Sequence, residues 1–153
     1  MGMNYYLRHP LSEEQKAELK KAIDRDEYTE AENIFAHART IHIGKRSRGW
    51  RFLWDAHYYF TPDRESLMEF LKSGIIYDEE GKAYTFDEFM QEIDHSLNNG
   101  DTIASYCKKF PGEDRWGPDP TYIAVFQRMG IYPDQYGEMN IDGLRFSCTE
   151  NFG

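Results

Sequence analysis

Residues 40–54 read Thr-Ile-His-Ile-Gly-Lys-Arg-Ser-Arg-Gly-Trp-Arg-Phe-Leu-Trp, and this stretch decides how the sheet is built. β-Branched and aromatic residues dominate both of its ends, which predicts strands over residues 40–43 and 50–54. Gly44 and Gly49 bound the polar connection between the two strands. We therefore expect a hairpin whose tip carries the basic side chains.

Upstream of this stretch the sequence predicts one strand and two helices. Residues 4–7 are the candidate strand. Ser12 and Gln15 have the spacing of a capping box, which starts a helix that runs to about Arg25. Thr29 and Glu32 have the same spacing and predict a short second helix through residue 36.

Downstream, helix and turn signals alternate. Thr61-Pro62 predicts the start of a third helix, because proline is well tolerated at the first helical position. Gly74 is expected to end this helix in the left-handed conformation. Its buried face is expected to consist of Leu67, Phe70 and Leu71.

Residues 75–97 predict a small hairpin followed by a helix. The runs 75–77 and 82–84 flank the turn at residues 78–81. Thr85 and Glu88 form a third capping pair, and an apolar stripe at helical spacing continues to Leu97.

The pattern weakens after Asp101. Residues 109–120 predict a surface loop, residues 122–129 fit either a helix or a strand, and residues 144–149 predict a last strand. The sequence as a whole indicates a single α+β domain over residues 1–153. We expect a small antiparallel sheet with a basic-tipped hairpin, packed by about three to four helices.

Composition excludes several classes of protein. Aromatic residues make up 16% of the chain, which disordered chains lack. No run of about 18 apolar residues is present, so we expect no membrane span. Residues 1–10 show no cationic region followed by an apolar stretch, so we expect no secretory signal. Cys107 and Cys148 form no close-spaced motif, and we interpret them as reduced thiols of a cytoplasmic protein.

Charge is distributed unevenly along the chain. The net charge is −9, yet residues 33–54 contain no Asp or Glu. Five cations fall in that segment: Arg39, Lys45, Arg46, Arg48 and Arg51. A basic island on an acidic body is suited to attract a small anion while the body repels long nucleic acid.

The basic segment contains the components of a phosphate or nucleotide site. Glycines allow a close approach of backbone N–H groups, cations supply charge, and aromatic rings offer stacking faces. The residues predicted to bind a ligand are Gly44, Lys45, Arg46, Ser47, Arg48, Gly49, Trp50 and Arg51, with Phe52 and Trp54 as further stacking rings. The spacing is neither that of a Walker A loop nor that of a dinucleotide fingerprint. The alternative is a basic hairpin whose aromatic residues are buried in the core.

His42 and His57 flank this segment and are weak candidates for a catalytic acid and base. Neither stands two residues before a Ser or Thr, as in two-histidine phosphoesterases, so structural histidines are the alternative. No spacing typical of a metal site is present, and we expect no metal and no cofactor.

The segment 42–52 resembles the core of a group of small proteins encoded by bacteriophages, in which His-Ile-Gly-Lys-x-Ser-x-Gly-Trp-x-Phe recurs. A Tyr-Tyr-Leu start matches residues 5–7. An Asp-Glu-x-Gly turn and a Glu-Glu-Phe-like helix start resemble residues 78–81 and 87–89, and the Phe-Ser-x-Thr-Glu-like end resembles residues 146–150.

The resemblance covers most of the chain but not residues 101–143. Residues 11–34 are an insertion relative to the group's pattern. The group supplies no catalytic residues to carry over, and it implies a viral accessory role.

We therefore expect a binding protein rather than an enzyme. It would act in the cytoplasm of an infected bacterium as a counter-defence factor, which either sequesters an anionic nucleotide or blocks a host defence protein. A phosphodiesterase or nucleotide-hydrolysing enzyme that uses His42 is the first alternative, and a virion or assembly protein is the second. The sequence is compatible with a monomer and with a homo-oligomer.

Overall fold

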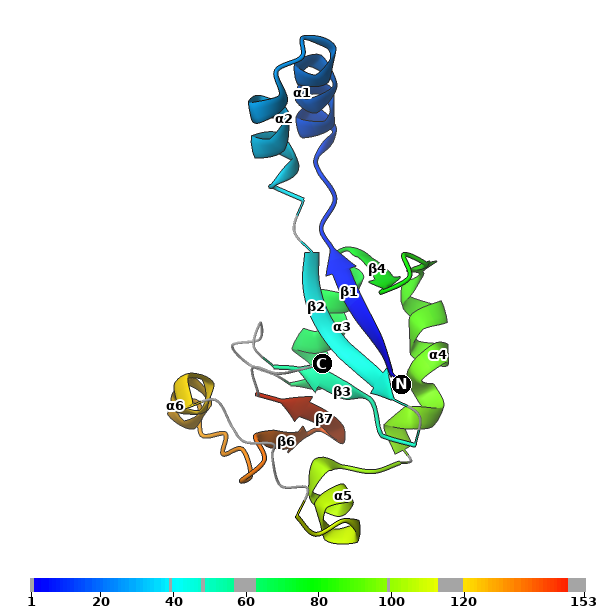
Figure 1. Cartoon of the computed structure of the whole chain (residues 1–153), viewed down its shortest axis with the longest axis vertical. Coiled ribbons are helices and arrows are strands. Elements are labelled where there is room, and N and C mark those ends of the chain that lie inside the picture. Colours follow the sequence, from blue (N-terminus) through cyan, green and yellow to red (C-terminus); the bar gives the residue numbers. More distant parts are fainter. Residues whose placement is uncertain are drawn as a thin grey trace.

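A computed structural model describes residues 2–38, 40–47, 49–56, 63–98, 100–112 and 120–148 (Figure 1). Within these ranges the strands are β1 (Gly2–Arg8), β2 (Thr40–Ser47), β3 (Leu53–Asp55), β4 (Ile75–Asp78), β5 (Ala83–Tyr84), β6 (Glu138–Ile141) and β7 (Leu144–Ser147). The helices are α1 (Glu13–Asp24), α2 (Tyr28–Phe35), α3 (Arg64–Lys72), α4 (Phe86–Asn98), α5 (Ile103–Lys109) and α6 (Pro120–Arg128). The predicted α+β class is confirmed.

All of these strands belong to one sheet, in the order β5-β4-β1-β2-β3-β7-β6. Neighbouring strands are antiparallel except β3 and β7, which are parallel. The sheet is therefore larger than predicted, and it is mixed rather than purely antiparallel. Local sequence patterns did not show this, because β3 and β7 lie far apart in the chain.

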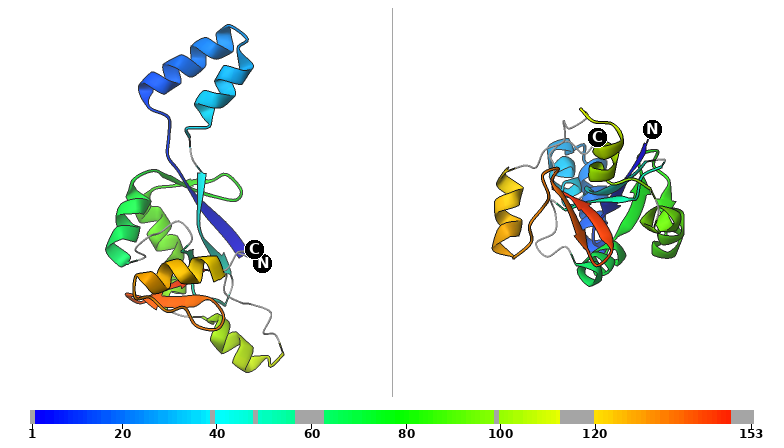
Figure 2. Two further views of the ribbon diagram at one scale, coloured as in Figure 1. Left: turned by 90° about the vertical axis from the view of Figure 1, so that its left-hand side faces the viewer. Right: turned by 90° about the horizontal axis from the view of Figure 1, so that it is seen from below.

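The core lies between one face of the sheet and helices α3 and α4. Tyr5 and Leu7 of β1 point to this face, and both are fully buried. They pack in one cluster with Leu67 and Leu71 of α3 and with residues of α4. Figure 2 shows α3 and α4 on the same side of β1 and β2. The opposite face of these strands therefore points away from both helices.

The predicted hairpin is present, but its strands differ from the predicted ones. The first strand was predicted to end at residue 43, but β2 continues through Gly44 to Ser47. β3 is short and pairs with β2 at Gly44–Trp54 and Lys45–Leu53. Lys45 and Arg46 therefore lie within strand β2 and not at the tip of the hairpin.

Helices α1 and α2 form a two-helix arm that we define as residues 11–38. The arm is inserted between β1 and β2 and stands clear of the sheet (Figures 1 and 2). It has its own small core of Ala22, Ala31 and Ile34, joined by Leu11 and Leu19. The arm includes residues 11–34, the segment that departs from the bacteriophage pattern.

The capping signals of the arm had different outcomes. The capping box at Ser12 and Gln15 is confirmed, with both reciprocal hydrogen bonds formed. The predicted cap at Thr29 is wrong, because α2 begins at Tyr28 after Glu27, which makes no side-chain cap. Asp26 turns the chain with φ +55°, so the helix restarts before Thr29 is reached.

Helix α3 starts and ends differently from the prediction. Asp63 caps its first turn by accepting from the Ser66 N–H at 2.8 Å, while residues 61 and 62 lie outside the described ranges. Gly74 is not left-handed. A Cβ at Gly74 would lie 2.5 Å from the Arg8 carbonyl oxygen, so close packing against β1 is what requires a glycine here.

The remaining elements include two that were not predicted, α5 and β6. The hairpin β4–β5 and the capping pair Thr85–Glu88 are confirmed. The ambiguous segment is helix α6, which begins with Pro120 and buries Phe126. The last strand ends at Ser147, and most of the predicted loop 109–120 lies outside the described residues.

No helix in the described part of the chain is long and apolar enough to cross a membrane.

Candidate functional site

The sheet divides the residues that were predicted to bind a ligand. Successive side chains of a strand point to opposite faces. Lys45 and Ser47 therefore share the face that points away from α3 and α4, whereas Gly44 and Arg46 share the core face. Arg48 lies outside the described residues. The prediction of a single basic tip is therefore wrong: Lys45 and Arg46 lie on opposite faces of β2.

Gly44 is a packing glycine. A Cβ at this position would lie 2.5 Å from Cε1 of Phe52 and 2.7 Å from the Leu53 carbonyl oxygen. Phe52 and Trp54 are 1% and 0% exposed, and their ring centroids lie 4.5 Å apart. These two rings belong to the core, so neither presents a stacking face to a ligand.

Arg46 is held on the core side by helix α4. Its Nη1 donates to Glu92 Oε1 at 2.7 Å and to the Glu92 carbonyl oxygen at 3.4 Å. The pair lies near the hydroxyl of Tyr5, whose pKa is raised by burial, with Arg46 opposing the shift and Glu92 adding to it. Arg46 therefore stabilises the contact between β2 and α4.

The connection between β2 and β3 is tied to the start of α5. Gly49 is exposed with φ +81°, a backbone conformation that favours glycine. Its carbonyl oxygen accepts from the Asp101 N–H at 2.9 Å, and the Arg51 N–H donates to the Asp101 carbonyl at 3.3 Å. A Cβ at Gly100 would collide with the backbone of Trp50, so this approach also requires a glycine.

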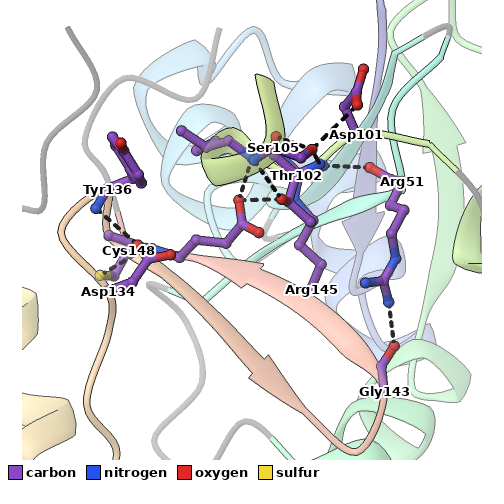
Figure 3. Close-up of polar contacts among 12 residues, drawn as sticks. Arg51, Asp101, Thr102, Ser105, Asp134, Tyr136, Gly143, Arg145 and Cys148 are labelled. Carbon is purple, nitrogen blue, oxygen red and sulfur yellow. Dashed lines mark hydrogen bonds and ion pairs between the residues drawn. The ribbon is translucent and has the colours of Figure 1, made fainter. Parts of the chain in front are cut away.

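Trp50 and Arg51 join the connection to the C-terminal part of the sheet. The Trp50 ring lies 5.1 Å from the Tyr106 ring and 5.1 Å from the guanidinium of Arg145. Arg51 extends to the turn between β6 and β7, where its Nη2 donates to the Gly143 carbonyl at 2.8 Å (Figure 3). Both residues therefore make structural contacts in this arrangement.

A buried ion pair, Arg145–Glu138, lies beneath these residues. Arg145 Nε approaches Glu138 Oε2 to 3.0 Å, without the alignment of a hydrogen bond, and both side chains are at most 2% exposed. Arg145 also donates to the Arg51 carbonyl at 2.7 Å, and Glu138 accepts from the Ile103 N–H at 3.0 Å. Burial lowers the pKa of Arg145, and the Glu138 charge opposes this shift.

Sequence reasoning missed this pair. Arg145 stands between two apolar residues of β7, and an alternating strand normally places such a residue in solvent. Glu138 lies in a segment without a clear periodicity. The burial of both charges depends on α5 and Trp50, which come from distant parts of the chain.

His42 belongs to a polar network on the face opposite the core. Its Nδ1 lies 2.8 Å from Asp55 Oδ2, and its Nε2 lies 3.0 Å from Asn4 Oδ1. The Asn4 amide nitrogen donates to Glu79, so the amide oxygen faces the ring. Both ring nitrogens therefore lie within hydrogen-bond distance of neighbouring side chains. His57, the other histidine candidate, lies outside the described residues.

Two tyrosines lie next to His42 on the same face. In the register of the sheet, Tyr6 is paired with His42 on one side and with Tyr77 on the other. The Tyr6 and His42 ring centroids are 5.4 Å apart. We call this surface of β4, β1 and β2 the tyrosine face. Strand alternation would have placed Tyr6 opposite the buried Tyr5, so this signal was present in the sequence.

The arm forms a second candidate surface. Ile23, Tyr28 and Phe35 are 51%, 63% and 59% exposed. An open groove of about 700 Å³ lies between α1 and α2, and its lining includes Ala22, Tyr28 and Ile34. Large apolar side chains on a projecting element are typical of a protein-binding surface.

The cysteines and acidic residues add no further chemistry in the described ranges. Cys107 and Cys148 are buried thiols, and Cys148 Sγ donates to the Gly137 carbonyl oxygen at 3.1 Å. The residues that the structure describes contain no group of three or more His, Cys, Asp or Glu placed to hold a metal ion.

Comparison with known proteins adds no relative: no protein-family model, no curated protein and no solved structure matches this chain.

Proposed function

We propose that this chain is a phage-encoded accessory protein that binds a host defence effector and blocks it. The observation that carries the proposal is the arm, a two-helix element that stands clear of the sheet and exposes large apolar side chains. The proposed contact residues are Ile23, Tyr28 and Phe35.

These side chains contribute little to folding. The arm's core is formed by Ala22, Ala31 and Ile34, and the three exposed residues are not part of it. Burial of one such side chain in an interface is worth about 1.5–3 kcal/mol. Three such side chains on one projecting element offer apolar area to a protein interface.

The charge of the arm favours a basic partner. Residues 11–38 carry eight acidic side chains and four basic ones. The acidic residues are Glu13, Glu14, Glu18, Asp24, Asp26, Glu27, Glu30 and Glu32. An arm with exposed apolar side chains and an excess of acidic ones complements the basic surface of a nucleic-acid-binding protein. The proposed partner is thus an effector whose nucleic-acid-binding surface the arm would cover.

Site-specific photocrosslinking in bacterial cells tests this proposal. A photoreactive amino acid replaces Phe35 or Tyr28 in separate experiments. Tyr132, which is 73% exposed outside the arm, is the control position. The expected product is a crosslink from the arm positions, absent from the control, to a protein that binds nucleic acid.

The purified partner is then tested for competition. The protein should displace nucleic acid from the partner, and the double change Ile23→Ser/Phe35→Ser should abolish this displacement. The matched change Ile75→Ser/Tyr132→Ser should leave it intact. A partner that still binds nucleic acid while the arm is bound would contradict the proposal.

The enzymatic alternative has one structural observation in its favour, the close contact between His42 and Asp55. An Asp–His pair can orient a general base. In this arrangement the second ring nitrogen is engaged by Asn4, so we expect no turnover of a nucleotide panel. Product formation that is lost on His42→Ala would contradict a function in binding alone.

A further inference from the structure

The tyrosine face places aromatic rings side by side across three strands. Tyr77 of β4, Tyr6 of β1 and His42 of β2 are neighbours in the register of the sheet. Tyr6 and Tyr77 are half-buried, so each ring keeps an exposed part. Adjacent aromatic side chains on a sheet are a common platform on which nucleic-acid bases stack.

One cation lies over this aromatic row, and a second lies on the same face of the sheet. Arg8 is two residues after Tyr6 on β1, about 7 Å along the strand, and its guanidinium lies 4.8 Å from the Tyr77 ring centroid. Lys45 is paired with Asn4, which lies two residues before Tyr6. The row thus has a positive charge over its Tyr77 end, and Lys45 lies on the same face with its side chain beside Gly2.

The acidic groups of this face are already engaged by neighbouring side chains. Asp55 contacts His42, and its side chain is 6% exposed. Glu79 accepts a hydrogen bond from Asn4 at 3.1 Å. These contacts hold both carboxylates beside the aromatic row rather than over it.

No helix in the described part of the chain covers this half of the sheet. Helices α3 and α4 lie on the opposite face of β1 and β2 (Figure 2). Helix α5 covers the other half, where its first residue bonds to Glu138 of β6. The tyrosine face is therefore the polar sheet surface that these helices leave uncovered.

We propose that the tyrosine face binds a small nucleotide, with its base stacked on Tyr6 beside the Arg8–Tyr77 pair and its phosphate held by Lys45 or Arg8. A net charge of −9 opposes the binding of a long polyanion, which favours a ligand of one or two nucleotides. This site is separate from the arm and goes beyond the proposed protein-binding function. Of the residues first predicted to bind a ligand, Lys45 and Ser47 share this face.

Titration of the full-length protein by calorimetry tests the proposal. The probes are adenosine monophosphate, a cyclic dinucleotide, inorganic phosphate and a 20-residue oligothymidylate. We expect a nucleotide to bind at least about tenfold more tightly than inorganic phosphate, because stacking adds to charge. A long oligonucleotide that binds much more tightly than the small probes would overturn the assignment of ligand size.

Paired variants locate the site. Lys45→Gln and Arg46→Gln remove the same charge from adjacent residues on opposite faces of β2. Lys45→Gln should weaken nucleotide binding at least fivefold, whereas Arg46→Gln should leave it within about twofold. Tyr6→Leu should weaken binding by roughly tenfold, because it removes the stacking ring. Tyr77→Leu should also weaken binding, because it removes the ring beneath the Arg8 guanidinium.

Amide chemical shifts of the unmodified protein provide a test that does not depend on a variant folding. Added nucleotide should shift resonances of β4, β1 and β2 and leave those of the arm unchanged. No binding by any probe at millimolar concentration, or shifts confined to other elements, would overturn the proposal. Neither result bears on crosslinking through the arm, so the two proposals fail separately.

Discussion

At the residue scale, Gly44 shows how one position can suggest two different roles. In sequence it resembles a glycine that lets a ligand approach the backbone. In space its Cα faces the Phe52 ring and the Leu53 carbonyl, and a methyl group would overlap both. The requirement for glycine is therefore internal to the core.

Gly44→Ala should lower the free energy of unfolding by about 1–3 kcal/mol, the usual cost of overpacking a core. Urea unfolding measures this change. Because Phe52 Cε1 is the closest atom, the double change Gly44→Ala/Phe52→Leu should cost less than the sum of the two single changes. Unchanged stability together with lost nucleotide binding would instead assign Gly44 to a ligand site.

Asp78 is a second residue whose role is set by its surroundings. It is 5% exposed, and its carboxylate accepts from the N–H groups of Glu80 and Lys82 and from the Tyr84 hydroxyl. Burial opposes ionisation, but the Lys82, Tyr84 and Glu80 hydrogen bonds outweigh it and lower the pKa of Asp78. The charged form thus organises the turn between β4 and β5.

Stability should therefore fall in acid through Asp78. Its pKa is lower in the folded state than the unfolded value of about 3.9, so its contribution is complete above that value. The contribution is lost as the pH falls through the folded pKa. Urea unfolding between about pH 5 and pH 2 should show a shallower acid dependence for Asp78→Asn than for the unmodified protein. An identical acid limb would contradict the assignment.

At the element scale, the Arg145–Glu138 pair joins parts that are distant in sequence. Glu138 of β6 holds the first residue of α5, and Arg145 of β7 holds the carbonyl of Arg51 and contacts Trp50. Since both charges are buried, each depends on the other for compensation.

Removal of one partner should cost more than removal of both. Arg145→Met leaves the Glu138 carboxylate buried without its cation, and we expect a loss of about 3–5 kcal/mol in unfolding free energy. The double change Arg145→Met/Glu138→Leu should recover part of that loss. Additive costs in urea unfolding would show that the pair acts as two independent contacts.

Elements with local signals were predictable. The capping boxes at Ser12 and Thr85 join residues three apart, so the sequence contains the whole interaction. Thr29 has the same spacing and does not cap, because after the turn at Asp26 the cap position is Glu27, two residues before Thr29. Helix α5 was missed because its contacts are mostly with distant residues such as Trp50 and Glu138. Strand β6 pairs with the adjacent strand β7, and it was missed because residues 138–141 show no clear alternation.

The candidate site was predictable only in part. Lys45 and Ser47 do lie on the face that points away from α3 and α4, but Arg46 and Gly44 lie on the core face. The sequence suggested a turn because two glycines bound the basic residues. In the structure β2 runs through Gly44. The side chains of residues 44–47 therefore alternate between the two faces of the sheet. Tyr77 joins the face through the pairing of β1 with β4, which no local pattern shows.

At the scale of the whole molecule, the protein consists of a sheet body and an arm that share few contacts. The two ends of the arm meet at neighbouring strands, since Arg8 of β1 is paired with Thr40 of β2. The arm's core cluster contains no residue of the body's core cluster. This separation suits a division in which the arm binds a protein and the tyrosine face binds a small ligand.

Excision of the arm should therefore leave a folded body. Replacement of residues 10–39 by Asn-Gly leaves a short loop, His9-Asn-Gly, between Arg8 and Thr40. His9 is retained because its ring lies 2.9 Å from the Ser73 hydroxyl. Short loops with a final glycine join antiparallel strands without strain. We expect the body to unfold cooperatively and to retain the amide shifts of β1, β2 and β4. It should also retain any nucleotide binding and lose crosslinking to the protein partner. A body that fails to fold would show that the arm stabilises the sheet, and the separation of the two functions would then be wrong.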